Sequence, residues 1–324
     1  MFTSSPFHVY DTGEDGKLQV LNKHSITSLK QNTMLTDKIA IITGASSGIG
    51  AALAKLFSKK GATVVLAARR VDKLHELAQQ IKADGGNAIV HPCDVTVKAE
   101  AEHLINQTFD DLKRVDILVN NAGRGHFASI EDTTDEMIQS MFKLNVYSLW
   151  YTVRPALKYM KQQGSGHIIN IASMAGKVAY PYNSAYVAAK HACVGFTHAL
   201  RLELAEMNIH ASVVCPNGVL TDWANVTEGG SMLPMFSEAG PIIKKIAEER
   251  DVSLPQIEGV IPAEIVAQKI LECIYAPIAE VYTHKGAKEF VELATRNREE
   301  AEKHQIPIVL GEREVYEKMK ERKP

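Results

Sequence analysis

Residues 38–50 read KIAIITGASSGIG, a short apolar run that leads into Gly44, Gly48 and Gly50. The apolar run is typical of a buried strand in a parallel sheet, and a helix is expected to follow at about 49–60. Glycine lets the backbone turn sharply and approach a phosphate closely, and a helix N-terminus presents free N–H groups to an anion. The stretch therefore predicts a strand–turn–helix unit that binds the phosphates of a nucleotide.

Strands and helices are expected to alternate regularly from this point to about residue 283. Further strands are expected at 62–68, 87–91, 115–119, 167–172, 209–215 and 279–283, and further helices at 71–83, 97–113, 134–162, 184–206 and 263–275. Such an order predicts a parallel sheet with helices on both of its faces. The expected fold class is therefore α/β, with a doubly wound parallel sheet of the Rossmann type, and ligands should bind at the carboxyl ends of the strands.

Three parts of the chain differ in composition. Residues 1–36 are polar and irregular and are expected to form a flexible arm. Residues 37–283 are expected to form the α/β domain. Residues 284–324 are charged and are expected to form a mostly helical tail, interrupted at 306–310, where the sequence IPIVL contains a helix-breaking proline.

The composition of the 324-residue chain argues against several classes of function. The net charge is −2, and no block of basic residues indicates binding to nucleic acid or to an anionic membrane. No apolar run reaches the roughly 18–20 residues that span a bilayer, and the N-terminal residues lack the pattern of a secretory signal. The four cysteines lie far apart, which argues against a disulfide framework or a zinc site. We therefore expect a cytoplasmic protein with reduced thiols and no metal site.

The end of the second expected strand indicates which dinucleotide is bound. An acidic residue there would bind both ribose hydroxyls of NAD, but the sequence reads Ala67-Ala68-Arg69-Arg70. A guanidinium pairs with a 2′-phosphate by charge and by geometry. The interpretation that both arginines are merely solvated is weaker, because cations at a helix N-terminus are mildly unfavourable without an anion. Arg69 and Arg70 thus predict NADP(H) rather than NAD(H).

Tyr186 and Lys190 lie four residues apart in an expected helix, in the sequence SAYVAAK. This spacing places both side chains on one face of the helix. Free tyrosine has a pKa of about 10 and is a poor base at neutral pH, whereas a nearby ammonium group lowers that pKa. Tyr186 could then exchange a proton with a substrate oxygen, although a YxxxK pair on its own is more often an ordinary surface pair.

Three further polar features lie where a ligand is expected. Ser173 follows the fifth strand, and its hydroxyl could hold a carbonyl or alkoxide oxygen. Asn145 interrupts the apolar face of a long helix, and the sequence NNAG (120–123) ends the fourth strand. Each feature alone could be a cap or a turn, but together they indicate a catalytic site.

These motifs together resemble the classical short-chain dehydrogenase/reductase family over about residues 36–283. The matching pieces are TGASSGIG (43–50), CDV (93–95), NNAG (120–123), Asn145, Ser173, YxxxK (186–190) and a proline segment (216–221). The resemblance implies a Rossmann-type sheet of about seven strands. It also implies an oxidoreductase that transfers a hydride between NADP(H) and a ketone, an aldehyde or a secondary alcohol, in a homodimer or homotetramer.

The same resemblance implies roles for individual residues. Tyr186 would be the general acid/base, Ser173 would orient the reacting oxygen, and both would contact the substrate. Lys190 would lower the pKa of the tyrosine and bind the nicotinamide ribose, while Asn145 would hold a water that links Lys190 to solvent. The implied cofactor contacts are Gly44, Ser46, Ser47, Gly48, Ile49, Gly50, Arg69, Arg70, Asp94, Val95, Asn121, Ala122, Gly123, Tyr186, Lys190, Val219 and Thr221.

The chain departs from the family pattern after the sixth strand. The family has Pro-Gly there, whereas this chain has Pro-Asn-Gly at 216–218. Asparagine tolerates a positive φ better than most other non-glycine residues. Asn217 can therefore take the place of a glycine, and no loss of activity is inferred.

The regular alternation stops after Thr221, and residues 222–258 are expected to form a mobile, apolar flap beside the substrate, with a short helix near 240–250. The methionines and aromatic residues of the flap favour an apolar substrate, unless they only pack beneath it. His126, Tyr180 and Tyr182 also keep two interpretations, since each could line the substrate site or be an ordinary loop residue.

Two other classes of protein with this fold agree less well with the sequence. A non-catalytic NADPH-binding regulator is expected to have lost part of the catalytic tetrad, whereas Asn145, Ser173, Tyr186 and Lys190 are all present. A sugar-nucleotide epimerase would have a TGxxGxxG loop and a larger C-terminal domain. The regulator remains the alternative to an enzyme.

Overall fold

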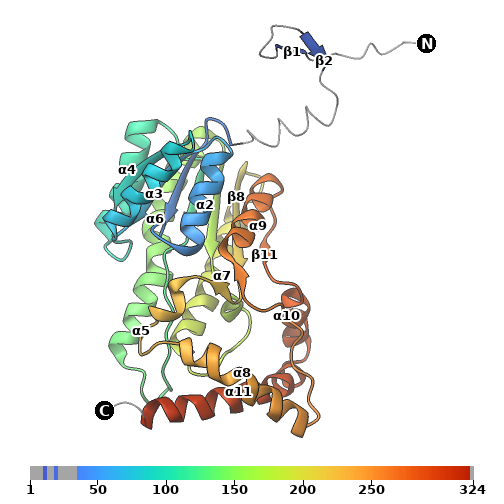
Figure 1. Ribbon diagram of the computed structural model, residues 1–324. Coiled ribbons are helices and arrows are strands. Elements are labelled where there is room, and N and C mark those ends of the chain that lie inside the picture. The colour runs from blue at the N-terminus through green and yellow to red at the C-terminus, as the bar shows by residue number, and fades with distance from the viewer. Residues whose placement is uncertain (1–9, 13–17, 21–34, 322–324) are drawn as a thin grey trace, which may run out of the picture.

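The centre of the molecule is a parallel sheet that contains seven strands in the part of the chain that the structure describes. The strands are β3 (Ile39–Thr43), β4 (Thr63–Ala68), β5 (Asn87–Pro92), β6 (Ile117–Asn120), β7 (Gly166–Ile171), β8 (Ile209–Cys215) and β11 (Glu280–Tyr282), in the spatial order β11-β8-β7-β6-β3-β4-β5. The computed structural model describes residues 10–12, 18–20 and 35–321 (Figure 1). It confirms the doubly wound α/β fold expected from the sequence.

Helices cover both faces of this sheet, as the alternating order of elements requires. The α-helices in the described part of the chain are α2 (Gly48–Lys59), α3 (Val71–Ala83), α4 (Lys98–Leu112), α5 (Asp135–Phe142), α6 (Ser148–Gln163), α7 (Ser184–Glu203), α8 (Leu233–Glu249), α9 (Ala263–Tyr275), α10 (Ala287–Arg296) and α11 (Arg298–Glu321), of which α2, α3, α4, α6, α7 and α9 pack on the sheet. Most of the helices expected up to residue 275 begin and end within about two residues of these bounds.

Successive residues of β3 enter different apolar cores, because side chains alternate across a strand. Ala40 and Ile42 pack in the core that contains Leu53 of α2 together with residues of α3 and α9. Ile41 packs in the core of the opposite face, which contains Leu104 of α4 together with residues of α6 and α7. Both faces of β3 are thus buried, which explains why its sequence is a continuous apolar run.

The strand order reverses between β3 and β6, which are direct neighbours with Ile41 opposite Leu118. β4 and β5 extend the sheet on one side, and β7, β8 and β11 extend it on the other. At such a reversal the connecting segments leave in opposite directions, so a crevice opens outside the carboxyl ends of the two strands. The glycine loop (43–50) and the NNAG sequence (120–123) both follow strands that end at this crevice.

The long helical stretch expected at 134–162 is continuous but contains one turn of different geometry. Residues Lys143–Tyr147 form a π-helical turn between α5 and α6, and Asn145 lies in this turn. A π turn inserts a residue into the helix and redirects the side chains next to it, and such turns are frequent at functional sites. The hydrophobic pattern alone did not predict this turn.

Two expectations for the C-terminal part differ from the structure. The short helix expected near 240–250 is longer and begins at Leu233, as α8. The interruption expected at 306–310 is wrong, because α11 is helical throughout Arg298–Glu321 with Pro307 inside it. Proline removes one helical hydrogen bond, but Pro307 is buried and α11 packs along α8, so tertiary packing stabilises the helix across this position.

α11 lies across the lower end of the molecule in Figure 1, next to α8 and beyond the carboxyl edge of the sheet. Gly311 makes this packing possible, since a Cβ there would lie 2.5 Å from Cγ1 of Ile243 in α8. Tyr316 fixes the other end, because its hydroxyl accepts from the backbone N–H of Ser129 and donates to Asp132, both at 2.9 Å. The tail therefore covers part of the carboxyl edge of the sheet.

Most of the arm expected at 1–36 lies outside the described residues. Residues Tyr10–Thr12 (β1) and Leu18–Val20 (β2) form a two-stranded antiparallel pair. Leu35, which was expected to belong to the flexible arm, is instead buried in the apolar core of the α/β domain. Within the described ranges, none of the helices is both long enough and apolar enough to cross a membrane.

Candidate active site

The loop after β3 turns sharply because two of its glycines have positive φ, +64° for Gly44 and +55° for Gly48. A third glycine is required by space, since a Cβ on Gly50 would lie 2.5 Å from the carbonyl oxygen of Gly44. α2 begins at Gly48, which places its N-terminus at the crevice. Bare backbone and a helix N-terminus together form a surface that suits a pyrophosphate.

Asn121 holds the glycine loop against the end of β6. Its side-chain Nδ2 donates to the carbonyl oxygens of Thr43 and Gly44 at 2.9 and 3.2 Å. The hydroxyl of Thr43 in turn accepts from the backbone N–H groups of Asn121 and Ala122 at 3.0 and 3.1 Å. The sequence predicted that Asn121 lies along the cofactor crevice. Its side chain is hydrogen-bonded to the backbone of the glycine loop and thereby fixes the shape of that loop.

The two arginines after β4 make different contacts. Arg70 donates to the hydroxyl of Ser46 at 3.0 Å and also to the hydroxyl of Ser47, both in the glycine loop. Arg69 is 68% exposed and lies 3.8 Å from the carboxylate of Asp94 after β5. Both arginines thus follow β4 at the carboxyl edge, where a ribose 2′-phosphate would be expected, but only Arg70 contacts the glycine loop.

Tyr186 is buried in α7, with only 7% of its surface exposed. Burial raises the pKa of its hydroxyl, and a hydrogen bond with Ser173 acts in the opposite direction. Ser173 lies just after β7 and accepts from the backbone N–H of Ala175 at 3.1 Å, which fixes its orientation. The structure therefore brings these two residues together at the carboxyl edge.

Lys190 lies one helical turn after Tyr186, with its ammonium nitrogen 5.6 Å from the centre of the tyrosine ring. The ammonium donates to the carbonyl oxygen of Ile171 at 2.8 Å, and burial lowers its pKa. Gly123 separates it from Asn145, since a Cβ on Gly123 would lie 3.4 Å from Lys190 Nζ and 2.9 Å from Asn145 Oδ1. The amide and the ammonium thus face one narrow space beside the NNAG segment.

The side-chain amide of Asn145 uses only part of its hydrogen-bonding capacity within the described residues. Its Nδ2 donates to the carbonyl oxygens of Met141 and Arg124 at 3.1 and 3.3 Å. Its Oδ1 is buried and, among the described residues, has no hydrogen-bond partner. A buried acceptor of this kind normally binds ordered water, which agrees with the role that the family resemblance implies.

A chain of buried hydrogen bonds fixes the two helices that carry these groups. Asn120 donates to Asn170 at 2.9 Å and accepts from Thr152 of α6 at 2.8 Å. Asn170 then donates to Thr197 of α7 at 2.9 Å. Sequence reasoning missed Thr152, Asn170 and Thr197, because polar residues scattered through apolar segments give no local signal of a shared network.

The segment after β8 passes close to the glycine loop. A Cβ on Gly48 would lie 2.9 Å from Cγ2 of Thr221, so Thr221 packs against the start of α2. Val219 lies in β9 (Val219–Leu220), which pairs with β10 (Ile261–Pro262). Asn217 does not have a positive φ, so the substitution for glycine needs no special conformation there.

The aromatic residues before α7 pack against the C-terminal helix. Tyr182 has a φ of +58° and stacks on Tyr316 of α11, with ring centroids 4.3 Å apart. Tyr180 donates to the side chain of Asn217 at 3.4 Å. His126 is fully buried, and burial lowers its pKa. Packing within the fold thus accounts for most of the surface of these three residues.

Two contacts beside Tyr186 were not expected from the sequence. The ring of Trp223, in the flap, lies 5.4 Å from the ring of Tyr186. Arg124, which follows the NNAG segment, forms an ion pair of 2.7 Å with Glu228. Both contacts join residues that lie far apart in the chain, and no spacing or motif links them.

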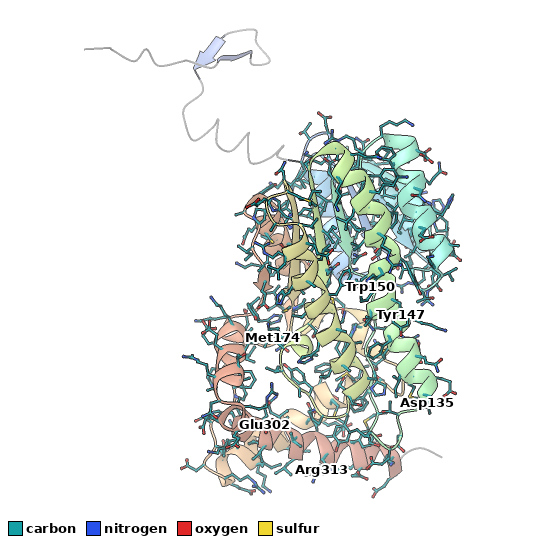
Figure 2. All side chains as sticks on the ribbon, turned by 180° about the vertical axis from the view of Figure 1, so that it is seen from behind. Asp135, Tyr147, Trp150, Met174, Glu302 and Arg313 are labelled. Atoms are coloured by element: carbon teal, nitrogen blue, oxygen red, sulfur yellow. The ribbon has the colours of Figure 1, made fainter. Side chains whose placement is uncertain are left out.

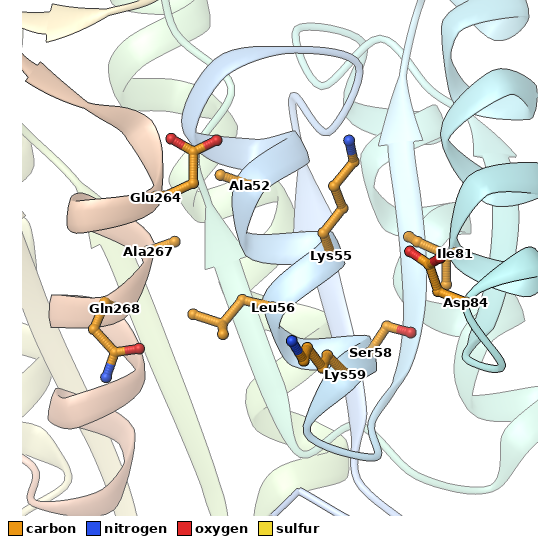
Figure 3. A pocket seen from close by; sticks show the side chains of 10 residues that line it. All are labelled: Ala52, Lys55, Leu56, Ser58, Lys59, Ile81, Asp84, Glu264, Ala267 and Gln268. Atoms are coloured by element: carbon orange, nitrogen blue, oxygen red, sulfur yellow. The ribbon is translucent and has the colours of Figure 1, made fainter. Parts of the chain in front are cut away.

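Separate from these residues, an open pocket of about 620 Å³ lies between α2 and α9. Figure 3 shows Lys55 and Lys59 of α2 on one side of it and Glu264 of α9 on the other. No residue expected in catalysis or cofactor binding lines this pocket. A smaller pocket of about 340 Å³ does reach the site, since Gly48 and Thr221 line it.

Comparison with known proteins agrees with this geometry. The model of the family described as short chain dehydrogenase matches residues 38–229. The D-beta-hydroxybutyrate dehydrogenase of Rhizobium meliloti (strain 1021) is 40% identical over 186 residues, which are 57% of this chain and 72% of that protein.

Two solved structures have the same fold. A short-chain dehydrogenase/reductase from Burkholderia phymatum in complex with NAD has a TM-score of 0.69 and 27% identity, covering 82% of this chain and 95% of that one. A single-residue variant of actinorhodin polyketide ketoreductase with NADPH has a TM-score of 0.66 and 30% identity, covering 76% and 95%. With the glycine loop and the buried Tyr186 at one sheet edge, these matches establish that the chain belongs to the short-chain dehydrogenase/reductase family of oxidoreductases.

Proposed function

We propose that the chain is an NADP(H)-dependent oxidoreductase that transfers a hydride between the nicotinamide ring and a ketone, an aldehyde or a secondary alcohol. The observation that carries the proposal is the environment of Tyr186. Tyr186 is buried, interaction of its hydroxyl with the Ser173 side chain lowers its pKa against the effect of burial, and its ring lies 5.6 Å from the ammonium of Lys190. A buried proton donor with an oxygen-binding partner and a nearby cation is what carbonyl reduction requires.

The described residues fit a dinucleotide that carries a 2′-phosphate. The glycine loop has no room for side chains at Gly44 and Gly50 and leaves its backbone accessible to a pyrophosphate. Arg69 and Arg70 support a preference for NADP(H), because a guanidinium is well suited to a phosphate. One of the two solved relatives holds NAD and the other NADPH, so this preference rests on the arginines. When bound, NADP(H) would supply the hydride in reduction and accept it in oxidation.

Tyr186 and Ser173 are proposed to act on the substrate oxygen. In the direction of reduction, the Ser173 hydroxyl donates a hydrogen bond to the carbonyl oxygen, and Tyr186 transfers its proton to that oxygen as negative charge develops there. Burial raises the pKa of Tyr186, so the hydroxyl is protonated at neutral pH and needs a nearby cation to release its proton. The buried ammonium of Lys190 then stabilises the phenolate that remains.

The proton lost from Tyr186 must be replaced before the next turnover. Lys190 and the unpaired Oδ1 of Asn145 face the same narrow space at Gly123. A water held by this oxygen would connect the ammonium to solvent and would return the proton through Lys190. In oxidation the same groups would carry the proton outward.

The substrate is proposed to be an apolar carbonyl compound or the matching alcohol. Trp223, which is only half-buried and lies beside Tyr186, supports an apolar ligand. The Rhizobium relative is named for a beta-hydroxy acid, and the actinorhodin enzyme is a polyketide ketoreductase. A 3-oxo or 3-hydroxy acyl compound is therefore a reasonable first substrate to test.

We also propose a cytoplasmic homodimer or homotetramer. Tyr147, at the end of the π turn, is 46% exposed, and Trp150 of α6 lies 4.5 Å from Phe196 of α7 (Figure 2). An exposed tyrosine next to a partly exposed pair of aromatic rings on α6 and α7 favours a partner there. Light scattering after gel filtration would give the number of subunits, and a monomer at micromolar concentration would contradict this part of the proposal.

The experiment that tests the function uses Tyr186→Phe in the purified protein. The wild-type protein should oxidise NADPH in the presence of a ketone, an aldehyde or a 3-oxoacyl thioester, and Tyr186→Phe should lose nearly all of this activity while still binding NADPH. Tyr159→Phe is the matched control, because the Tyr159 hydroxyl bonds Asn106 away from the site. Full activity in Tyr186→Phe would contradict the proposed chemistry.

A further inference from the structure

Trp223 lies directly against the proposed catalytic tyrosine. The two ring centroids are 5.4 Å apart, with the ring planes tilted by 57°. Trp223 packs on the buried cluster formed by Met141, Ala175, Ala185 and Tyr186, yet the tryptophan itself is only half-buried. One side of the indole therefore touches the catalytic residue while another side remains accessible.

Gly125 provides the space that the indole occupies. A Cβ on Gly125 would lie 2.3 Å from Cζ2 and 2.6 Å from Cη2 of Trp223, and 2.7 Å from Cγ2 of Thr227. Gly125 does not have a positive φ, so glycine is needed here for space and not for backbone conformation. Any side chain at this position would displace the indole from its present position beside Tyr186.

The segment that carries Trp223 is held in place by hydrogen bonds. The backbone N–H of Glu228 donates to Gly125 at 2.9 Å, and the N–H of Phe127 donates to Glu228 at 2.8 Å. The ion pair between Glu228 and Arg124 adds a contact of 2.7 Å between side chains. At the other end, the hydroxyl of Thr221 accepts from the N–H of Trp223 at 3.3 Å. Contacts on both the N-terminal and the C-terminal side of Trp223 in the chain thus position the indole.

We propose that Trp223, positioned by Gly125, is the specificity-determining wall of the substrate site. This inference rests on the proposed function. A carbonyl compound whose oxygen reaches both Tyr186 and Ser173 must place one of the two groups on its carbonyl carbon beside the indole. A flat or unbranched apolar group can lie along the indole and gain contact with it. A group branched next to the carbonyl would overlap the indole and would be excluded.

The test compares two methyl ketones that differ only in the shape of the second substituent. Acetophenone carries a flat ring, and pinacolone carries a branched tert-butyl group. In the wild-type protein kcat/KM should favour acetophenone. Trp223→Ala should change the ratio of the two kcat/KM values toward pinacolone by about tenfold or more, the range expected when one apolar wall of a pocket is removed.

A double-mutant cycle separates this role from simple packing. Gly125→Ala displaces the indole and should change the substrate ratio in the same direction as Trp223→Ala. In the Trp223→Ala background, Gly125→Ala should leave the ratio unchanged, because there is no indole to displace. If both single variants lower kcat/KM equally for the two ketones, Trp223 is only a packing residue and the inference is wrong.

A binding measurement does not depend on turnover or on the stability of Trp223→Ala. The chain contains two tryptophans, at 150 and 223, so Trp150→Phe leaves the indole of Trp223 as the single emitter. In the Tyr186→Phe background, where no turnover is expected, saturating 1-phenylethanol with NADP⁺ should change its emission beyond the change caused by NADP⁺ alone. An unchanged spectrum would overturn the inference.

Failure of the inference can be told apart from failure of the proposed function. Absence of turnover by the wild-type protein on every carbonyl compound would contradict the proposed function itself. Turnover that depends on Tyr186, with an unchanged ketone ratio in the Trp223 and Gly125 variants, would contradict only the role of Trp223.

Discussion

The ammonium of Lys190 donates a 2.8 Å hydrogen bond to the backbone carbonyl of Ile171, the last residue of β7. This bond fixes the cation near the ring of Tyr186 although burial disfavours its charge. The strand end that precedes Ser173 therefore also positions the lysine. One strand thus orders both Ser173, the proposed partner of the substrate oxygen, and the cation beside Tyr186, the proposed proton donor.

Replacing Lys190 with methionine should slow catalysis and change its pH dependence. Burial already raises the pKa of Tyr186, and loss of the cation raises it further. Alcohol oxidation needs the phenolate, so its rate should rise with pH, and in Lys190→Met this rise should move to higher pH. We expect kcat to fall by about 10²-fold or more at neutral pH.

The pH profile of kcat for alcohol oxidation checks this prediction. Lys177→Met is a suitable control, because Lys177 pairs with Glu280 at 2.6 Å instead of facing the tyrosine. An unshifted profile in Lys190→Met would show that the cation does not act on Tyr186.

Arg70→Ala and Arg69→Ala should each weaken the binding of NADPH and leave the binding of NADH nearly unchanged. A charge-assisted bond to phosphate contributes roughly 1.5–3 kcal/mol, so Kd for NADPH should rise by about tenfold or more in either variant. Titration of nucleotide fluorescence measures both affinities. Lys73→Ala serves as a control, since Lys73 lies in α3 and pairs with Glu76 at 2.8 Å. Equal losses for NADPH and NADH would refute the assignment of the 2′-phosphate.

Gly50→Ala should disrupt the glycine loop, because the new Cβ would lie 2.5 Å from a backbone oxygen. The loop must then open, and we expect NADPH affinity to fall together with the melting temperature. Gly195→Ala is the matched control. Gly195 lies inside α7, and a Cβ there would meet nothing within 4 Å among the described residues. This control should gain up to about 1 kcal/mol of stability from helix propensity. If Gly50→Ala has the same melting temperature and the same NADPH affinity as Gly195→Ala, the close packing of the loop is not as described.

Glu312→Gln should stabilise the protein at alkaline pH. Burial raises the pKa of Glu312 to about 7, so the folded state binds a proton more tightly than the unfolded state. The charged carboxylate therefore destabilises the fold increasingly as pH rises from the unfolded pKa toward 7, and fully above it. The advantage of the glutamine variant should grow between pH 5 and pH 8 to on the order of 1–2 kcal/mol.

Urea unfolding at several pH values measures this difference. Glu317→Gln, at an exposed position of the same helix, is the control and should show little change. A stability difference for Glu312→Gln that does not vary with pH would contradict the prediction.

The parts of the site that the sequence predicted depend on short spacings or on strand ends. Tyr186 and Lys190 share a helix face, and Ser173 and Arg70 closely follow strands, so regular secondary structure places them at the carboxyl edge. The sequence showed that Asn145 is a polar residue on an apolar helix face. It did not predict the π turn that contains Asn145, because a hydrophobic pattern does not distinguish π from α geometry.

The parts that the sequence did not predict depend on contacts between distant segments. Gly125 and Trp223 fit together only after β6 and the flap have been placed, and neither residue belongs to a motif. The continuous helix at Pro307 also depends on contacts between distant segments. Local propensity predicts a break there, and the packing of α11 on α8 overrides it. Tertiary contacts of this kind cannot be read from local composition.

The position of α11 has a consequence for how the protein is made. Ribosomes synthesise α11 after every element that it covers, including the flap helix α8 and the loop that holds Tyr316 through Ser129. Since chains fold as they emerge, the sheet and the glycine loop can assemble while the carboxyl edge is still open to solvent. The nascent chain would thus form the crevice at the glycine loop first, and the cover over that edge only when α11 has left the exit tunnel.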